Sequence, residues 1–235
     1  MIIPTYNEAE SLPILLRELS ILHKDFNYLV VDDGSPDGTA DICEKLKSEI
    51  PHLEILRRSM KSGLGSAYRD GYRYALEKNL DAVIQIDADR SHQVSDLPNL
   101  LSKFESDSSL DLVIGSRWIK GGSVLNWSKH REALSRLANI YSNFLLGLGV
   151  KDSTAGFRVY KTSAIKKLNL VSIKSEGYCF QIEMSREIKK IGGVISEVPI
   201  TFVERQFGKS KMSGKIVIEA MLRVTYWGLL RIFRK

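Results

Sequence analysis

The chain has 235 residues, of which 43% are hydrophobic and 26% are charged, and this composition excludes a long disordered tract or a fibrous repeat. An α/β chain of this length commonly forms one domain with a sizeable core. The formal net charge of +6 favours an anionic partner, which is a phosphorylated substrate, a nucleic acid or an anionic lipid.

Cysteine content and apolar runs indicate where such a chain works. Cys43 and Cys179 are too few for a disulfide framework or a thiolate metal cluster, so we interpret both as buried thiols in a reducing cytoplasm. The N-terminus lacks the basic start and apolar core of a signal peptide. No run of roughly 18 apolar residues is present that would span a bilayer. We therefore expect a cytoplasmic protein whose membrane contact, if any, is peripheral.

The first half of the chain alternates between strands and helices. After a very short first strand before Pro4, leucines recur at helical spacing over 12–22, and the apolar run 28–31 is typical of a buried strand. Further strands are predicted at 53–56, 82–86 and 110–114, and further helices at 40–50, 65–78 and 95–104, the last with Ser95 as its N-cap. This alternation predicts an α/β fold with a mostly parallel central sheet flanked by helices.

The second half predicts a long helix over 129–146, a helix over 178–191 and a strand over 194–202. No Pro- or Ser-rich linker marks a boundary, so residues 1–212 are expected to form one domain. Residues 213–235 predict an amphipathic helix in which Trp227 falls among the basic residues. This helix either lies in a membrane interface, with the indole at the headgroup boundary, or packs on the core.

Polar residues follow three of the predicted strands, at the edge where open parallel sheets bind ligands. The first strand is followed by Pro4-Thr-Tyr-Asn-Glu8, the second by Asp32-Asp33-Gly34, and the fourth by Asp87-Ala88-Asp89. Asp32-Asp33-Gly34 alone is equally typical of an ordinary turn. Together, we expect the four aspartates and Glu8 to share one cleft.

Asp87 and Asp89 carry the most specific chemical signal. Two carboxylates one residue apart on a loop suit a hard divalent cation that also bridges two phosphates, although a solvated acidic turn is the alternative. Such a cation, Mg²⁺ or Mn²⁺, would neutralise the charge on a departing nucleoside diphosphate. The pair therefore indicates glycosyl transfer.

These segments and Gly63-Leu-Gly-Ser-Ala67 resemble, in order and spacing, the family-two glycosyltransferases of GT-A fold. The second half resembles the dolichol-phosphate and polyprenol-phosphate mannosyltransferases of that family, in Gly115-Ser-Arg117, 154–160, 177–183 and 202–211. The resemblance implies a GT-A catalytic domain over 1–212. It also implies transfer of mannose from GDP-mannose to a dolichyl or polyprenyl monophosphate, in one metal-dependent inverting step that gives a β-linked mannosyl phosphate lipid and GDP.

The resemblance also assigns site residues. Asp87 and Asp89 are the implied metal ligands, and Ser91 stands where some relatives have a further Gln ligand. Implied to bind the donor are Pro4, Tyr6, Glu8, Val31, Asp33, Asp87, Ala88, Asp89, Arg117, Arg205 and Lys211. Implied to bind the acceptor phosphate are Arg117, Arg131 and Ser135. Implied to act in catalysis, by charge stabilisation, are Asp89, Arg117, Arg131 and Arg205. A phosphate acceptor is already ionised near neutral pH, so no general base is expected.

Other readings remain open at this point. One is a family-two enzyme that moves another sugar, such as glucose from UDP-glucose, onto the same lipid phosphate; another is a non-catalytic nucleotide-sugar binding protein. Nothing resembles a nucleic-acid recognition motif, so no nucleic acid is expected. A separate membrane-anchoring partner protein stays open. The histidines are interpreted as surface or loop residues: His23, His52, His92 and His130.

Overall fold

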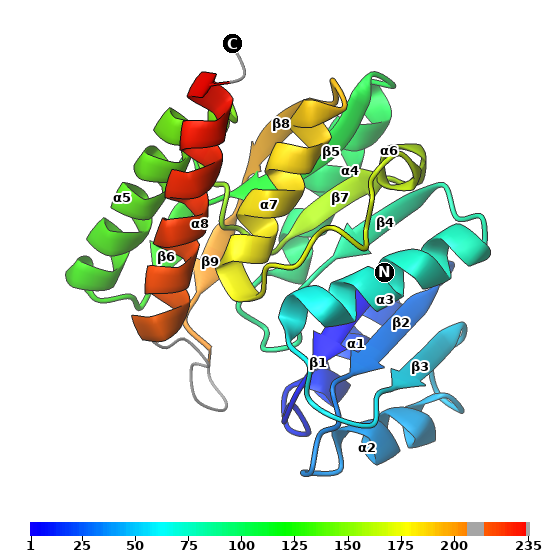
Figure 1. The fold of residues 1–235 in the computed structure, drawn as a ribbon. Coiled ribbons are helices and arrows are strands. Elements are labelled where there is room, and N and C mark those ends of the chain that lie inside the picture. Colours follow the sequence, from blue (N-terminus) through cyan, green and yellow to red (C-terminus); the bar gives the residue numbers. More distant parts are fainter. Residues whose placement is uncertain (206–213, 234–235) are drawn as a thin grey trace.

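The computed structural model describes residues 1–205 and 214–233. At its centre lies a seven-stranded sheet with the strand order β3-β2-β1-β4-β7-β5-β8 (Figure 1). Its strands are β1 (Ile2–Thr5), β2 (Tyr28–Asp32), β3 (Leu53–Arg57), β4 (Ala82–Gln85), β5 (Leu110–Ser116), β7 (Arg158–Lys161) and β8 (Val194–Pro199). β7 runs antiparallel to both of its neighbours, whereas the other neighbouring strands pair in parallel. The predicted α/β fold with a mostly parallel sheet is confirmed.

Each face of the sheet carries its own apolar core because successive strand residues point to opposite faces. Ile2 packs on one face and Ile3 on the other. The first core also takes side chains from α3 (Leu64–Glu77), α6 (Thr162–Lys166) and α7 (Gly177–Lys190). The second core takes side chains from α1 (Leu12–Leu22), α2 (Thr39–Leu46) and α4 (Leu97–Ser106). Cys43 and Cys179 are buried, free thiols within these cores, as predicted.

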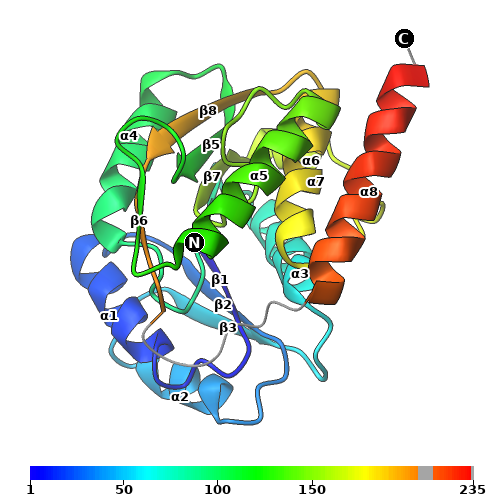
Figure 2. The same ribbon diagram turned by 90° about the vertical axis from the view of Figure 1, so that its left-hand side faces the viewer.

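Two further helices, α5 (Lys129–Leu146) and α8 (Gly214–Phe233), lie side by side at one end of the molecule (Figures 1 and 2). Their backbones approach closely at Gly228, where an added Cβ would lie 3.0 Å from the Cβ of Leu145. The N-cap of α5 is Ser128, whose side chain accepts from the amide of Arg131, and Gly147 ends the helix at φ 61°. None of the helices within the described residues has the length and apolar character needed to cross a membrane.

Several boundaries differ from the sequence predictions. Ser95 lies inside a 3₁₀ turn, η1 (Val94–Asp96), and α4 begins only at Leu97, so the predicted N-cap is wrong. The single strand predicted over 194–202 is two strands, β8 and β9 (Thr201–Val203), and β9 pairs with β6 (Ser123–Leu125) in a separate two-stranded sheet. β8 ends at Pro199, which pairs with Ser116 at the end of β5, and the amide of Ile200 still donates to the carbonyl of Ser116 (3.1 Å).

The C-terminal helix starts at Gly214, close to the predicted start, but Trp227 does not lie among solvated basic residues. Its exposed fraction is 8%, and the guanidinium of Arg186 on α7 lies 5.0 Å from its ring centroid. Of the two alternatives predicted for this helix, packing on the core is the one that the position of Trp227 supports. Trp227 packs α8 against the body of the protein.

Candidate active site

The carboxyl ends of β1, β2 and β4 open into a cavity of about 320 Å³, here called the strand-end cavity. Most of the residues predicted to bind the donor line it. They are Pro4, Tyr6, Glu8, Asp33, Asp87, Ala88, Asp89 and Arg205. Segments that are remote in the sequence are thus brought together by the parallel strands, as strand-end positions predict.

Within the described part of the chain, some residues predicted for the cleft or for donor binding do not line this cavity. The side chain of Val31 is buried in the apolar core beneath the cavity. Asp32 turns away and accepts from the hydroxyl of Thr5 (2.9 Å) and from the amide of Ser35 (2.9 Å), so its carboxylate shapes a turn and does not share the cleft. Arg117 lines a second cavity, described below. Lys211 lies outside the described residues.

Asp33 links two loops that form the wall of the strand-end cavity. Its carboxylate accepts from the guanidinium of Arg58 (2.7 Å) and from the amides of Ser62 (2.9 Å) and Gly63 (2.8 Å). These bonds hold the loop between β3 and α3, which places the ammonium of Lys61 3.9 Å from the ring centroid of Tyr6. Sequence reasoning missed Arg58 and Lys61, because their role depends on contacts between separate loops.

Asp87 is held in place by two buried side chains. The hydroxyl of Tyr68 donates to Oδ1 (3.2 Å), and Nε2 of His92 lies 3.3 Å from Oδ2. Burial alone would raise the pKa of Asp87, but the hydrogen bond and charge of His92 hold that pKa below its usual value. His92 is 2% exposed and packs between the rings of Phe157 and Phe202. His92 lies in the loop after β4, as predicted, but its imidazole is buried and not at the surface.

Asp89 accepts from the amide of Ser91 (3.0 Å) and forms an ion pair with Arg205 (2.8 Å). Together with Asp87 it presents carboxylate oxygens to the strand-end cavity. Within the described part of the chain, no group of three or more His, Cys, Asp or Glu side chains gathers as a metal cluster. Mg²⁺ commonly takes one or two carboxylates and completes its shell with substrate phosphates and water. The pair therefore fits a hard divalent cation that is shared with a phosphorylated substrate.

A carboxylate from the second half of the chain completes the cavity. Glu176, just before α7, accepts from the first amides of α3, those of Gly65 (2.6 Å) and Ser66 (3.0 Å), and from Arg69 (3.3 Å). Burial raises the pKa of Glu176. At Gly65 an added Cβ would lie 2.3 Å from the carbonyl oxygen of Ser175. The Gly63-Leu-Gly65 segment thus lets α3 dock against the chain that leads into α7.

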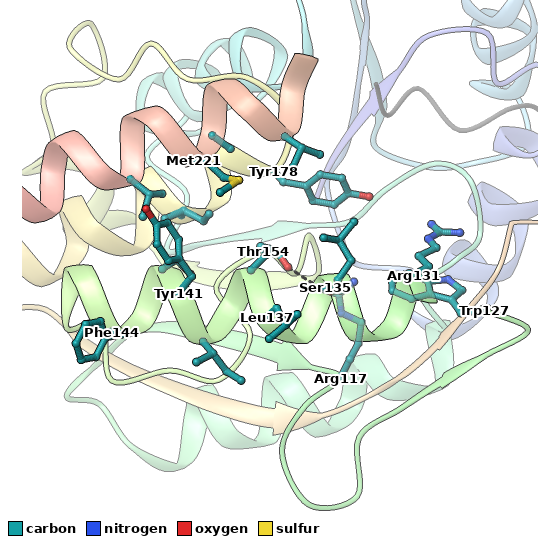
Figure 3. Close-up of a pocket in the computed structure, with 18 residues that line it drawn as sticks. Arg117, Trp127, Arg131, Ser135, Leu137, Tyr141, Phe144, Thr154, Tyr178 and Met221 are labelled. Atoms are coloured by element: carbon teal, nitrogen blue, oxygen red, sulfur yellow. Dashed lines mark hydrogen bonds between the residues drawn. The ribbon is translucent and has the colours of Figure 1, made fainter. Parts of the chain in front are cut away.

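A second cavity of about 550 Å³ lies among α5, α7 and α8, and is here called the helical groove (Figure 3). Its walls are mainly apolar side chains, including Leu134, Leu137, Ile140, Phe144, Met221 and Val224. The three residues predicted to bind an acceptor phosphate, Arg117, Arg131 and Ser135, also line it. Thr154 and Tyr178 line both cavities, so the helical groove adjoins the strand-end cavity at these two side chains.

Arg117 is fixed by a buried ion pair that sequence reasoning missed. Asp152 accepts from Nε (2.7 Å) and Nη2 (2.7 Å) of Arg117 and from its amide (2.9 Å), and Nη2 also donates to Thr154 (2.8 Å). Burial would raise the pKa of Asp152, but the charge of Arg117 and these hydrogen bonds hold that pKa below its usual value. The guanidinium is rigidly placed, with its charge largely compensated.

Arg131 and Ser135 lie one turn apart on α5, as predicted. Arg131 forms an ion pair with Glu204, and its guanidinium lies 4.0 Å from the ring centroid of Trp127. Figure 3 shows the side chains of Arg131 and Trp127 next to each other. Arg136 instead pairs with Glu132 on the same helix (2.8 Å).

Comparison with known proteins fits this geometry. Residues 1–168 match the model of the family described as Glycosyl transferase family 2. The chain is 47% identical to the undecaprenyl-phosphate mannosyltransferase of Micrococcus luteus over 228 residues, which cover 97% of this chain and 93% of that protein. It is 44% identical to the polyprenol monophosphomannose synthase of Mycolicibacterium smegmatis over 230 residues, which cover 97% of this chain and 86% of that protein.

Solved structures with lower identity share the fold. Glucosyl-3-phosphoglycerate synthase from Mycobacterium tuberculosis, crystallised with Mn²⁺ and UDP-glucose, matches with a TM-score of 0.68 at 18% identity, covering 98% of this chain and 77% of that chain. Mannosyl-3-phosphoglycerate synthase from Rubrobacter xylanophilus matches with a TM-score of 0.63 at 20% identity, covering 99% and 72%. The family match and the two relatives that align over almost the whole chain show that this protein belongs to glycosyl transferase family 2, and that its α/β domain is a glycosyltransferase domain of GT-A type.

Proposed function

We propose that the protein transfers mannose from GDP-mannose to a polyprenyl monophosphate, giving polyprenyl β-D-mannosyl phosphate and GDP. One observation carries this proposal: the helical groove, mainly apolar along its length, has Arg117, Arg131 and Ser135 in its lining and adjoins the strand-end cavity. An apolar groove with cationic groups at the junction suits an amphiphile with a phosphate head. The names of the two relatives, both similar over almost the whole chain, support the same acceptor and sugar.

Exposed apolar side chains of α5 and α8, some of which also line the helical groove, support a membrane contact. Large apolar side chains on both helices are half or more exposed, with exposed fractions such as 65% for Ile140, 81% for Phe144 and 67% for Leu222. Proteins that work free in water rarely expose contiguous apolar patches of this kind. We infer that this two-helix face rests in the membrane interface, where a polyprenyl chain can pass from the lipid into the groove.

The donor occupies the strand-end cavity in this proposal. Tyr6, Lys61 and Asp33 form the wall for the nucleoside, and Asp87 and Asp89 would hold a divalent cation beside the diphosphate. When bound, that cation supplies positive charge that stabilises the departing diphosphate. Arg205 forms an ion pair with Asp89. We expect its guanidinium to donate to the diphosphate when the donor is bound. The prediction that Lys211 also contacts the diphosphate stands as part of this proposal.

The chemical step needs no side-chain nucleophile. The ionised acceptor phosphate attacks the anomeric carbon of mannose with one oxygen, the bond from that carbon to the diphosphate oxygen breaks, and the configuration inverts. Arg131 and Ser135 orient the attacking phosphate, while Asp152 keeps Arg117 fixed beside it. Thr154 and Tyr178, which line both cavities, exclude water around the sugar. Orientation and charge stabilisation therefore supply most of the rate enhancement.

A direct test uses the purified full chain with a short polyprenyl phosphate, Mg²⁺ or Mn²⁺, and labelled GDP-mannose or UDP-glucose in parallel. Label that enters the organic phase from GDP-mannose alone supports the proposal. Label from UDP-glucose moves the assignment to the other sugar donor. No label from either donor, with a folded protein, contradicts the lipid phosphate acceptor and favours a binding protein without transfer activity.

A further inference from the structure

The end of β9 lies between the two cavities. The amide of Val203 donates to the carbonyl of Ser91 (2.9 Å), in the loop that carries Asp87 and Asp89, and the amide of Glu204 donates to the carbonyl of Leu125 (3.1 Å). Leu125 ends β6, two residues before Trp127 and shortly before α5. Residues 203 and 204 are therefore attached on one side to the strand-end cavity and on the other to the helical groove.

The next two side chains point to different sites. Arg205 pairs with Asp89 in the strand-end cavity, whereas Glu204 pairs with Arg131, which lines the helical groove. The side chains of Arg131 and Glu204 are 28% and 30% exposed, so their ion pair is half-buried. Glu204 and Arg205 are adjacent and of opposite charge, and each pairs with a charged side chain in a different cavity.

Arg131 is held on two sides. One terminal nitrogen, Nη1, donates to Glu204, and the indole of Trp127 lies 4.0 Å from the guanidinium. To the residues that the structure describes, the guanidinium makes no further hydrogen bond, so Nε and Nη2 remain for a ligand in the groove. A guanidinium bound on one edge by a carboxylate loses less conformational freedom when a phosphate binds its other edge.

We propose that Glu204 is a positioning residue for the acceptor: it fixes Arg131 so that the remaining guanidinium nitrogens receive the phosphate of a prenyl phosphate. The inference rests on the proposed function, since it takes the helical groove as the acceptor site. It adds that Glu204 is the neighbour in sequence of Arg205. Arg205 pairs with Asp89, a carboxylate of the proposed donor site. One backbone segment therefore sets charged groups in both cavities.

A double-mutant cycle on the full chain tests this, with farnesyl phosphate as the probe and isothermal titration calorimetry as the measurement. Glu204→Gln is expected to weaken farnesyl phosphate binding about fivefold, and Glu204→Gln combined with Arg131→Gln is expected to bind no more weakly than Arg131→Gln alone. Binding of farnesol, which lacks the phosphate, and binding of GDP should stay unchanged, a selectivity that a general structural role would not produce. Glu132→Gln, which breaks the Arg136 pair on the same helix, is the matched control and should change nothing.

Four results would overturn the inference. Tighter binding in Glu204→Gln would mean that this carboxylate only competes with the phosphate. Additive losses in the cycle, or an equal loss for farnesol, would mean that Glu204 does not act through Arg131. Farnesyl phosphate that fails to bind the wild-type chain would remove the acceptor site itself, and with it both the inference and the proposed function. Circular dichroism and GDP binding confirm that each variant is folded.

Discussion

The strand-end cavity and the helical groove are built in opposite ways. The strand-end cavity lies on the ends of buried strands, and its carboxylates are each held by neighbours such as Tyr68, His92 and Ser91. The helical groove lies among three helices, its lining is mainly apolar, and some of its side chains reach the surface, such as Phe144 at 81% exposed. In the proposed function, polar chemistry that depends on geometry thus rests on the sheet, whereas recognition of the prenyl chain is left to helix surfaces.

The largest expected effect lies in the strand-end cavity. Asp89→Asn removes one of the two carboxylates proposed to hold the cation, so the leaving diphosphate loses charge stabilisation and kcat should fall roughly a thousandfold. Thermal unfolding should change little, because an amide oxygen in place of the carboxylate can still accept from the amide of Ser91. Asp41→Asn, which only breaks an exposed pair with Arg57, is the control with normal kcat. Full activity of Asp89→Asn would contradict the metal assignment.

The next effect concerns the boundary between the two regions. Asp152→Asn leaves the buried guanidinium of Arg117 without a charged partner, so the free energy of unfolding should drop by about 3–5 kcal/mol in a urea titration. Arg17→Gln breaks the exposed pair with Glu49, where both side chains are about half exposed, and should cost less than about 1 kcal/mol. Similar losses of unfolding free energy in both variants would contradict the stabilising role of the buried Arg117–Asp152 pair.

A smaller effect is expected on the exposed surface of α8, beside the helical groove. Leu222 is exposed on α8 but does not line the groove. Leu222→Asp should therefore weaken binding to liposomes about tenfold, since it removes an apolar side chain from the proposed membrane face. Activity on a short, water-dispersed acceptor should be retained. Ile21→Asp changes an equally exposed residue on α1 and should not alter liposome binding; equal sedimentation of all three proteins would exclude this face as the membrane contact.

The smallest effect is a pH dependence. The pKa of Asp152 is lowered in the folded protein, so below the ordinary aspartate value of about 3.9 the unfolded chain binds a proton that the folded chain does not. The stability contributed by Asp152 is present above that value and is lost as the pH falls through the lowered pKa. Urea titrations between about pH 5 and pH 3 should show a steeper loss for the wild type than for Asp152→Asn. Parallel pH profiles would contradict the shift.

The sequence predicts much of the strand-end cavity, because one simple rule, polar residues after buried strands, places Tyr6, Glu8, Asp33 and the Asp87–Asp89 pair. It cannot place residues whose partners are far away in the chain. Asp152 binds an arginine 35 residues earlier, and Glu204 binds one 73 residues earlier. His92 has no local pattern that distinguishes a buried imidazole from a loop histidine.

Helix surfaces were harder still to interpret from sequence. The apolar and basic residues of α8 predict amphipathicity, but the angular position of Trp227 among the basic residues leaves open whether it faces a membrane interface or the core, and the side chain is buried against Arg186 of α7. Helical periodicity gives which residues share a face, but it does not give which face docks when both faces carry apolar residues. That choice depends on α5 and α7, which lie earlier in the sequence.

The contact between Glu176 and the first turn of α3 also affects the order in which the chain can fold. The amides of Gly65 and Ser66 receive their carboxylate partner from 110 or more residues downstream. During synthesis, β1 to β4 emerge from the ribosome well before that partner, so the first turn of α3 lacks this carboxylate until Glu176 and α7 follow. The strand-end cavity, which is the proposed donor site, is then expected to be completed late in folding, together with docking of α7, which also lines the helical groove.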